Sequence, residues 1–457
     1  MQLERVRKNH MDVEWHEYTD ENGQNTPVIN ASITEKASII GRVGIMFLSC
    51  GTGAWRVRSS MNALAEAMGI TCTADIGLMS IEYTCFDGEN GFTQSLCLTN
   101  TGVNTSKLNR LEHFIRNFET EGKNNFYLEN LEILRKNYEL QNIDFEVKDE
   151  NIADFLSGLK NQTIVTDFNP LINSDVFENY QGKVYEVDTH NIIPARIASE
   201  KQEYSAFTFR KKVYDKIYEY LTDFPKIKFT KNKGYAILED FVKNKLKDYP
   251  KDKNNPDLRG TSNLSPYFNF GFLSPQRAAI EVLKSDAPYE SKEVYLEELI
   301  VRAELSDNFC LYNKNYKSFD GAPDWAKKTL NYHIKDLRPH IFSQEQLENA
   351  RSYDELWNAT QKQLIEEGKI HGYLRMFWAK KLLEWTNTPY EAVDIAVYLN
   401  DKYAYDGESP NGYVGILWSI AGLHDRPFMN MPVTGEIRRL TGIKGKAERE
   451  KYIKRYL

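Results

Sequence analysis

Apolar and polar positions change rhythm along the opening part of the chain. Residues 37–69 carry apolar side chains at helical spacing, and an interruption at 49–53 predicts two helices joined by a turn. Residues 74–86 and 92–98 are predicted to be two strands of a hairpin. Residues 106–118 return to a helical pattern. The opening part of the chain is therefore expected to be a small α/β unit.

Helices and strands alternate in the next part of the chain. Residues 126–138 and 152–159 are predicted to be helices, and 145–147 a short strand. The apolar runs 163–166 and 184–187 are bounded by turn residues, as buried parallel strands would be. The alternation predicts a fragment of an open α/β sheet, because the region is too short for a whole one.

Helical spacing dominates from Tyr204 to the C-terminus. The expected fold class is an α/β N-terminal part with an incomplete parallel sheet, followed by a large all-α domain. We place the domains at 1–122, 123–203 and 204–457. We expect the helical core to be independent of what precedes Tyr204. We also expect residues 1–122 to form a separate unit that leaves the parallel sheet incomplete, behind a flexible connection at 122–125.

Composition and charge narrow the possible classes of protein. At 457 residues, with 41% hydrophobic and 27% charged positions, the chain can hold two or three domains with sizeable cores. The net charge of −7 argues against a general polyanion binder but allows a local basic surface. No apolar run approaches the roughly 18 residues of a membrane span, and the N-terminus lacks a signal-peptide pattern, so we expect a cytoplasmic protein. The five Cys form no Cys-x-x-Cys pair, which predicts reduced thiols and no metal site.

One predicted helix combines a charge with large apolar side chains. Arg375, Trp378, Leu382 and Trp385 are spaced to line a single helix face. Two Trp seven residues apart are most simply explained as a core stripe. A guanidinium on the same buried face requires a carboxylate partner, and Asp406 is the nearest downstream candidate.

Two stretches have the composition of phosphate loops. Residues 51–53 (Gly-Thr-Gly) lack the third Gly and the Lys of a nucleotide loop, so a helix–helix turn is preferred. Residues 259–265 cluster hydroxyls and backbone N–H groups just before a helix, which suits a pyrophosphate. A group of helix N-caps explains the second stretch equally well.

Longer motifs resemble two families. The runs SCGTGAWRVRSSMNALAEAMGI, TADIGLMSIEYTC and TNTGVNTSKLNRLEHFIRNF resemble the soluble N-terminal part of the threonine/serine exporter family over residues 39–122. Such exporters need a membrane-spanning portion, and this sequence contains no such segment, so we expect no transport. From about residue 125 to the C-terminus, the chain resembles the class II deoxyribodipyrimidine photolyases. The motifs that carry this resemblance are SNLSPYFNFG, ELSDNFCLYN, GAPDWAKKTL, LWNATQ, KIHGYLRMFWAKKLLEW, YLNDKYAYDG and NGYVGILWSIAGLHDR.

The photolyase resemblance implies an all-α domain that binds FAD in a U-shape. It implies light-driven repair of cyclobutane pyrimidine dimers, by electron transfer from the reduced FAD anion to a dimer flipped out of UV-damaged DNA. A fixed Arg375–Asp406 pair and a neutral amide, Asn400 facing flavin N5, would stabilise that anion. The resemblance implies that the FAD phosphates and ribityl chain are bound by Tyr249, Thr261, Ser262, Asn263, Leu264 and Ser265. It implies that the flavin and its sugar are surrounded by Asn308, Arg375, Asp406, Gly407 and Asn411.

The same resemblance supplies an electron relay and a DNA surface. Three Trp match the family's relay, in the order Trp385, Trp378, Trp357 from the flavin outward to the surface. Trp378 and Trp385 are roughly 10 Å apart along a helix axis, close enough for their ring edges to approach. The basic residues of 438–457 predict either a phosphate-binding rim or a solvated helix. The substrate and DNA contacts are Glu298, Met376 and Trp418, with positive charge from Lys253, Arg302 and Arg426.

The resemblance also indicates which part of a photolyase this chain replaces. Photolyases of this class begin with a complete α/β domain, and the exporter-like segment stands in place of its opening strands and helices. This argues against a deazaflavin antenna and predicts an exposed sheet edge. Two function classes stay open: a monomeric light-dependent repair enzyme, and a chimera that is inactive or only partly active.

Overall fold

The structure is a computed structural model whose contacts divide the chain into two compact units, Met1–Asn125 and Phe126–Leu457. It describes residues 31–49, 52–77, 79–98, 121–147, 152–159, 161–172, 174–177, 180–225, 227–258 and 260–457. The helix expected at 106–118 lies outside the described residues.

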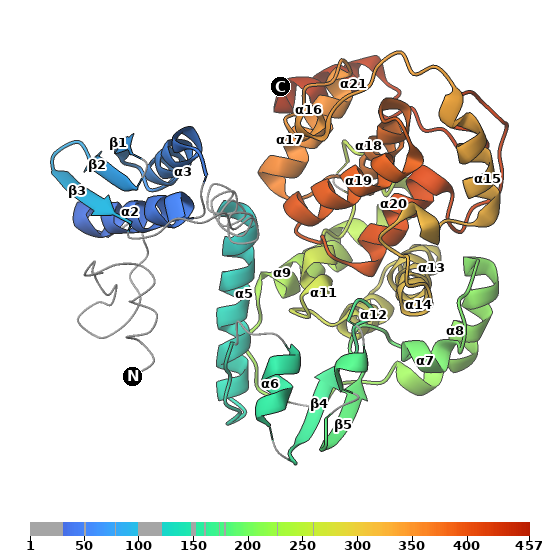
Figure 1. Ribbon diagram of the computed structural model, residues 1–457. Helices are drawn as coiled ribbons and strands as arrows, with labels where there is room; N and C mark the ends of the chain where they lie inside the picture. Colours follow the sequence, from blue (N-terminus) through green and yellow to red (C-terminus); the bar gives the residue numbers. More distant parts are fainter. Residues whose placement is uncertain are drawn as a thin grey trace. The chain divides into compact units, whose positions relative to one another are not determined.

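The first unit is a three-stranded antiparallel sheet covered on one face by two helices (Figure 1). The expected helix pair and the turn between its members are confirmed. The prediction of a single strand over 74–86 is wrong, because this stretch belongs to two antiparallel strands, β1 and β2, that pair with each other. The elements are α2 (Ile33–Ser49), α3 (Ala54–Ala67), β1 (Thr71–Ile76), β2 (Ser80–Phe86) and β3 (Gly91–Cys97).

The core of this unit follows the alternation of β2. Ile81, Tyr83 and Cys85 are buried beneath α2 and α3, while the residues between them face outward. The Tyr83 hydroxyl donates a hydrogen bond to the Ala37 carbonyl at 2.8 Å, which ties the sheet to α2. The hairpin between β2 and β3 is confirmed by their antiparallel register.

Helix α5 (Glu121–Glu139) runs across the division between the two units. The backbone at 122–125 is helical, and the chain divides after Asn125, next to the expected connection, whose flexibility stays a prediction. Among the described residues, β1–β3 form one sheet and the parallel strands form another. As expected, the described strands of the first unit pair with one another and not with the parallel strands.

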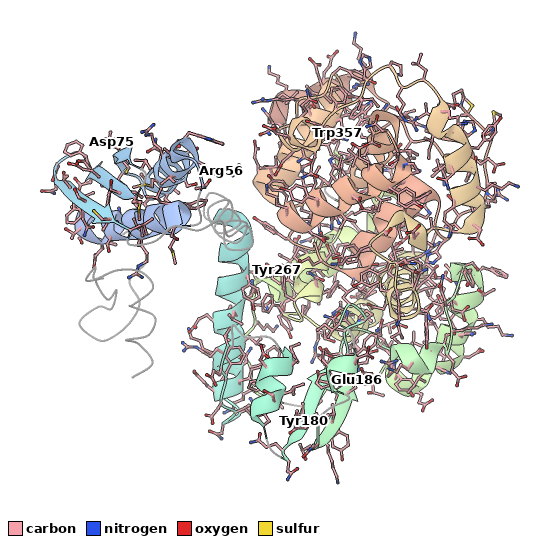
Figure 2. The ribbon with its side chains drawn as sticks, in the orientation of Figure 1. Arg56, Asp75, Tyr180, Glu186, Tyr267 and Trp357 are labelled. Carbon is pink, nitrogen blue, oxygen red and sulfur yellow. The ribbon has the colours of Figure 1, made fainter. Side chains whose placement is uncertain are left out.

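In the second unit, α6 (Ile152–Gly158) is followed by two parallel strands, β4 (Thr163–Asp167) and β5 (Lys183–Val187). Figure 2 labels Tyr180 and Glu186 on this part of the chain. The parallel pairing is confirmed, but the expected burial is wrong: Val165 is 67% and Tyr185 is 54% exposed. A parallel sheet needs helices over both faces to bury such side chains. Residues 145–147 form no strand.

The rest of the second unit is helical, as expected, apart from one isolated bridge between Met431 and Gly435. Its helices, short and wide-turn segments included, are η2 (Ser174–Phe177), α7 (Ala195–Ala198), α8 (Ala206–Tyr220), α9 (Lys233–Asp240), η3 (Phe241–Lys245), η4 (Leu246–Asp248), α10 (Tyr249–Asp252), α11 (Ser265–Asn269), α12 (Pro275–Lys284), α13 (Tyr289–Leu296), η5 (Glu297–Arg302), α14 (Ala303–Tyr312), η6 (Phe319–Gly321), α15 (Asp324–Tyr332), η7 (His333–Lys335), α16 (Gln344–Glu348), α17 (Glu355–Glu367), α18 (Gly372–Trp385), α19 (Pro389–Tyr403), α20 (Pro410–Ala421) and α21 (Lys446–Tyr456).

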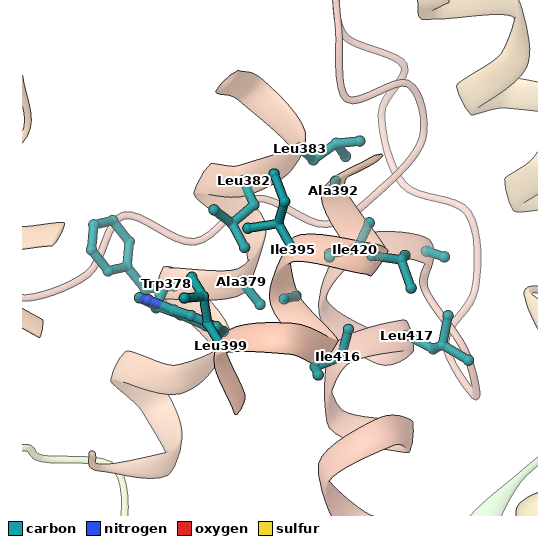
Figure 3. Close-up of a cluster of buried hydrophobic side chains, with 14 of the residues drawn as sticks. Trp378, Ala379, Leu382, Leu383, Ala392, Ile395, Leu399, Ile416, Leu417 and Ile420 are labelled. Atoms are coloured by element: carbon teal, nitrogen blue, oxygen red, sulfur yellow. The ribbon is translucent and has the colours of Figure 1, made fainter. Parts of the chain in front are cut away.

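Two cores stabilise this unit. The larger one forms where α18, α19 and α20 meet, and Figure 3 shows Trp378, Leu399 and Ile416 converging there from the three helices. The other lies around α8, α9, α12 and α13 and includes Ile192 and Ile193, which precede α8. The expectation that the helical core begins at Tyr204 is therefore wrong.

A buried carboxylate explains why the segment after β5 belongs to the helical core. Glu304 Oε1 on α14 accepts hydrogen bonds from the backbone N–H groups of Ile192 at 2.8 Å and Ile193 at 3.2 Å. Asn308 Oδ1, one turn further along, accepts from the Glu203 N–H at 2.7 Å. The backbone N–H groups of Ile192, Ile193 and Glu203 thus depend on α14 for their hydrogen bonds.

We expect Ile193→Ala to lower the free energy of unfolding by about 2–5 kcal/mol, because its fully buried side chain leaves a cavity in the second core. The matched control is Ile197→Ala, whose side chain is 43% exposed and whose loss should stay within about 0.5 kcal/mol. Urea unfolding of the full chain, followed by tryptophan fluorescence, measures both. Equal effects from the two variants would show that the segment merely lies on the helical core.

Candidate functional site

The second unit contains a cavity of about 280 Å³ that adjoins an inner chamber of about 90 Å³. The two share Ser265, Leu299, Arg375 and Asp406 in their walls, so they form one continuous site. Together they reach the lower end of the roughly 300–1,000 Å³ typical of small-molecule and cofactor sites. The sequence-predicted residues in the walls are Tyr249, Thr261, Ser262, Asn263, Leu264, Ser265, Glu298, Arg375, Asp406 and Asn411.

The loop 261–265 forms one wall of the cavity. Asn263 has a φ of +57°, and its side-chain oxygen accepts a hydrogen bond from the Thr261 hydroxyl at 3.2 Å. Helix α11, which follows, is five residues long and no side chain caps its first turn. The helix-cap interpretation of these hydroxyls is therefore wrong. Hydroxyl and backbone groups are left to line the cavity as donors, without help from a long helix dipole.

Asp406 is the charged centre of the site. Its Oδ1 accepts from Arg375 Nη2 at 2.6 Å, and its Oδ2 accepts from the Ser265 hydroxyl at 2.6 Å. Lys369 Nζ lies 3.8 Å from Oδ2. Burial alone would raise the pKa of Asp406, but the charges of Arg375 and Lys369 outweigh it and hold this pKa well below its ordinary value. The pairing inferred from the helix stripe therefore forms.

A local widening of a helix brings Glu298 into the wall. Segments α13, η5 and α14 run as one helix, and η5 is a wide turn of the kind that often marks functional sites. Glu298 and Leu299, both in η5, line the cavity. Glu298 Oε1 pairs with Lys253 Nζ at 2.8 Å, and both lie beside Tyr249.

The inner chamber contains a His–carboxyl pair that the sequence analysis missed. His190 follows the carboxyl end of β5, and its Nδ1 lies 3.6 Å from Asp307 Oδ1 on α14. Burial raises the pKa of Asp307, and the nearby His190 opposes this shift. Loops after parallel strands are common ligand positions, and this rule would have singled out His190.

The three Trp that the resemblance assigns to a relay are all buried, with Trp357 in the middle. Trp357 stacks on Trp378 with ring centroids 6.3 Å apart and 5° between planes, and it meets Trp385 edge-on at 5.4 Å. The expected order is therefore wrong, because Trp378 and Trp385 contact each other only through Trp357. Trp378 is one helical turn from the cavity residue Arg375, whereas Trp385 is roughly 15 Å away along the axis. Trp357 is labelled in Figure 2.

The outer end of this stack is a tyrosine. The Tyr353 ring meets Trp385 at 5.5 Å, and its hydroxyl accepts from Trp385 Nε1 at 3.3 Å. Tyr353 is 55% exposed, so it connects the buried indoles with solvent. Sequence reasoning missed its position beside Trp385, because Tyr353 lies outside the motifs that carry the resemblance.

Three residues assigned to the flavin do not line the cavity. Asn308 is 1% exposed and holds the backbone at Glu203 and Lys201. Asn400 is 2% exposed, donates to Asp401 Oδ1 at 3.1 Å and is absent from the walls of both chambers. A Cβ at Gly407 would lie 2.6 Å from the Asn400 carbonyl, so glycine is required there for packing.

The residues assigned to substrate and DNA are dispersed. Met376 and Trp418 are half-buried, and Lys380 Nζ lies over the Trp418 ring at 5.3 Å. Arg302 lies 3.5 Å from Glu297, and Arg426 is exposed. Of these residues, Glu298 lines the cavity, and Lys253 is paired with it.

The basic C-terminal segment forms α21, which packs on α17. Tyr452 and Tyr456 are buried and donate to Gln363 and Glu367. Lys446 is exposed on the opposite side, 3.9 Å from Glu450. One face of this helix is therefore structural, and its other face carries solvated charge.

A larger cavity of about 430 Å³ lies at the carboxyl ends of β4 and β5. In its wall Glu186 pairs with Arg196 at 3.0 Å, and Asp167 accepts a hydrogen bond from the Thr189 hydroxyl at 2.5 Å. None of the residues that the photolyase resemblance assigns to FAD or DNA lines this cavity.

Comparison with known proteins finds strong similarity to deoxyribodipyrimidine photo-lyases. The chain is 44% identical over 318 residues to the protein from Potorous tridactylus, covering 60% of each chain. It is 41% identical over 345 residues to the protein from Oryza sativa subsp. japonica and 40% over 358 residues to that from Arabidopsis thaliana. These matches cover 64% and 66% of this chain, and 68% and 72% of the relatives.

Other comparisons concern the opening segment and the fold. A family model described as a putative threonine/serine exporter matches residues 38–140, so this likeness extends past the expected end at 122. No helix in the described ranges is long and apolar enough to cross a membrane. Among solved structures, a bacterial class III photolyase from Agrobacterium tumefaciens matches at 13% identity and a TM-score of 0.48, over 67% of this chain and 70% of its own.

The relatives share one name, and the identity exceeds 40% over most of the rice protein. The chain spans less than two thirds of the length of the marsupial relative. The sequence motifs, the helical unit with its cavity and these relatives agree on one assignment. The chain belongs to the deoxyribodipyrimidine photo-lyase family.

Proposed function

We propose that the second unit binds FAD in the cavity around Asp406 and repairs cyclobutane pyrimidine dimers in DNA in a light-dependent reaction. The observation that carries the proposal is this cavity, whose wall includes the loop 261–265 and the Arg375–Asp406 pair. The shared family name of the relatives supports the same chemistry.

The wall residues fit the cofactor chemically. The hydroxyls and amides of 261–265 are donors suited to phosphate and ribityl oxygens. Phe268, Leu299 and Ala303 supply an apolar surface for a planar ring system. The Arg375–Asp406 pair offers a charged donor and acceptor to the polar edge of that ring.

Each residue then has a separate task. Reduced FAD supplies an electron when it absorbs light. Arg375, fixed by Asp406, keeps positive charge beside the cofactor, so its anionic form is stabilised without a mobile counter-ion. Glu298 at the wall presents a carboxyl to a flipped base, while Lys253 holds that side chain in place. We further propose that the protein is of class II type, acts as a monomer and holds no deazaflavin antenna.

We also propose that the buried aromatics conduct electrons to the cofactor in the order Tyr353, Trp385, Trp357, Trp378. Ring contacts join every successive pair. Indoles and phenols are oxidisable, and close packing keeps each gap short. The relay would recharge an oxidised cofactor, whereas repair itself moves the electron toward DNA.

The first test is the purified protein itself. We expect FAD absorption near one cofactor per chain, and loss of dimers from a thymine-dimer oligonucleotide under near-ultraviolet or blue light but not in darkness. A dark incubation and an undamaged oligonucleotide are the controls. A flavin-loaded protein without repair would favour the inactive chimera, for which the two-stranded, solvent-exposed sheet is the structural argument. A protein without flavin would end the proposal.

Asp406→Ala should remove FAD retention. It leaves Arg375 and Lys369 as two neighbouring cations without their carboxylate, which costs on the order of 3–5 kcal/mol. The matched control is Asp324→Ala, whose side chain is 99% exposed. The ratio of flavin to protein after gel filtration measures both variants. A normal ratio in Asp406→Ala would show that the cofactor does not depend on this cluster.

Trp378→Phe should abolish photoreduction of the oxidised flavin and leave repair intact once the flavin is reduced chemically. The reason is that Trp378 is the relay member next to the cavity. Trp325→Phe, a half-buried indole outside the stack, is the matched control and should keep the parental photoreduction rate. Absorbance changes under blue light give the rates. Parental photoreduction in Trp378→Phe would make the stack a core feature only.

A further inference from the structure

Two loops that run side by side bring Lys369 to the cavity. Gly368 ends α17 in a left-handed conformation with φ of +62°, and a Cβ there would overlap the Tyr405 ring. The Tyr405 N–H donates to the Gly368 carbonyl at 2.8 Å. Lys369 and Asp406, the next residues of the two loops, are therefore held together by the backbone.

The Lys369 ammonium is anchored at the phosphate-loop end of the wall. Its Nζ donates to the Ser265 hydroxyl, which in turn donates to Asp406 Oδ2 at 2.6 Å. Ser265 is the last residue of the loop 261–265. The ammonium thus lies where the loop donors and the charged cluster meet.

The charges around this point do not balance. Arg375 and Lys369 share one carboxylate, that of Asp406. In the larger cavity the other lining carboxylate, Glu298, is paired with Lys253 at 2.8 Å, while Asp307 lies beside His190 in the inner chamber. Burial lowers the pKa of His371, the remaining lining base, so it is neutral above pH 7. This part of the wall therefore carries a surplus positive charge.

We propose that Lys369 is an anion-binding residue of this cavity that contacts a phosphate group of the dinucleotide. The inference rests on the proposed function, because it takes FAD as the occupant. A compact ammonium suits a phosphate as a point charge, and the Ser265 contact directs it toward the loop. Arg375 bonds the opposite carboxylate oxygen, so the two cations serve different parts of the ligand.

The charge state of Lys369 gives the proposal a pH signature. Burial lowers its pKa to about 8; Arg375 adds to the shift and Asp406 opposes it. The lowered pKa of Asp406 keeps it ionised at pH 7–9, and burial raises the pKa of Tyr295 in the same wall to about 12. A bound phosphate favours the ammonium and raises its pKa, so binding takes up a proton above pH 8. FAD affinity should therefore fall about tenfold between pH 7 and pH 9.

The test compares three full-length chains after removal of flavin: the parent, Lys369→Met and Lys369→Arg. We expect Lys369→Met to bind FAD about 10- to 100-fold more weakly than the parent at pH 7. The affinity of this variant should change little between pH 7 and pH 9. Lys369→Arg keeps its charge at both pH values, so its affinity should vary little with pH. Fluorescence titration with FAD gives each dissociation constant. The same tenfold pH dependence in the parent and in Lys369→Met would overturn the proposal.

Two controls separate this inference from its alternatives. Riboflavin, which lacks phosphate, should bind the parent and Lys369→Met equally in equilibrium dialysis at millimolar concentration. An equal loss for FAD and riboflavin would place Lys369 against the ring and refute the phosphate contact. Where riboflavin binds too weakly to measure, the pH profiles decide. A parent that binds no FAD at pH 7 would refute the proposed function, whereas a parent that binds FAD without pH dependence would refute only the role of Lys369.

Discussion

A single buried carboxylate organises the functional half of this chain. Asp406 receives hydrogen bonds from Arg375 on α18 and Ser265 at the start of α11, and it lies beside Lys369 from the loop after α17. These segments are distant in sequence. Removing the carboxylate from water is tolerable only because two cations and a hydroxyl surround it. The same requirement fixes the walls of the cavity, so the cluster serves folding and ligand geometry together.

The aromatic stack shows that core packing and electron transfer are compatible interpretations. Trp357 Nε1 donates to the Trp378 carbonyl at 2.9 Å, and Trp378 Nε1 donates to Gln361 Oε1 at 2.9 Å. Such satisfied N–H groups hold each ring in one orientation in the core. Fixed rings at short separation are also what a relay needs. Tyr353 at the outer end is 55% exposed, and its ring also packs against His340 and Phe342, so packing and the proposed relay both account for its position.

Sequence reasoning succeeded where one helix sets the geometry. The spacing of Arg375, Trp378 and Trp385 fixes their common face, and the buried guanidinium then required Asp406. It failed where neighbouring elements decide the outcome. The order of the Trp depends on how α17 packs against α18, which no periodicity reveals. Asn308 and Asn400 have side chains suited to a ligand, yet their amides are engaged by Glu203 and Asp401. Exposure of Val165 likewise reflects the absence of covering helices among the described residues, and the apolar run itself carried no sign of it.

The segment after β5 explains how an incomplete sheet coexists with an ordered cavity. Its backbone donors at Ile192, Ile193 and Glu203 have no strand to pair with, so α14 satisfies them through Glu304 and Asn308. Residues 126–457 therefore form one compact unit, in which the two-stranded sheet is joined to the helices through this loop. Because His190 lies in the same loop and reaches the inner chamber, the α/β fragment contributes directly to the site wall. The order of the cavity thus depends on contacts with α14 more than on the number of strands in the sheet.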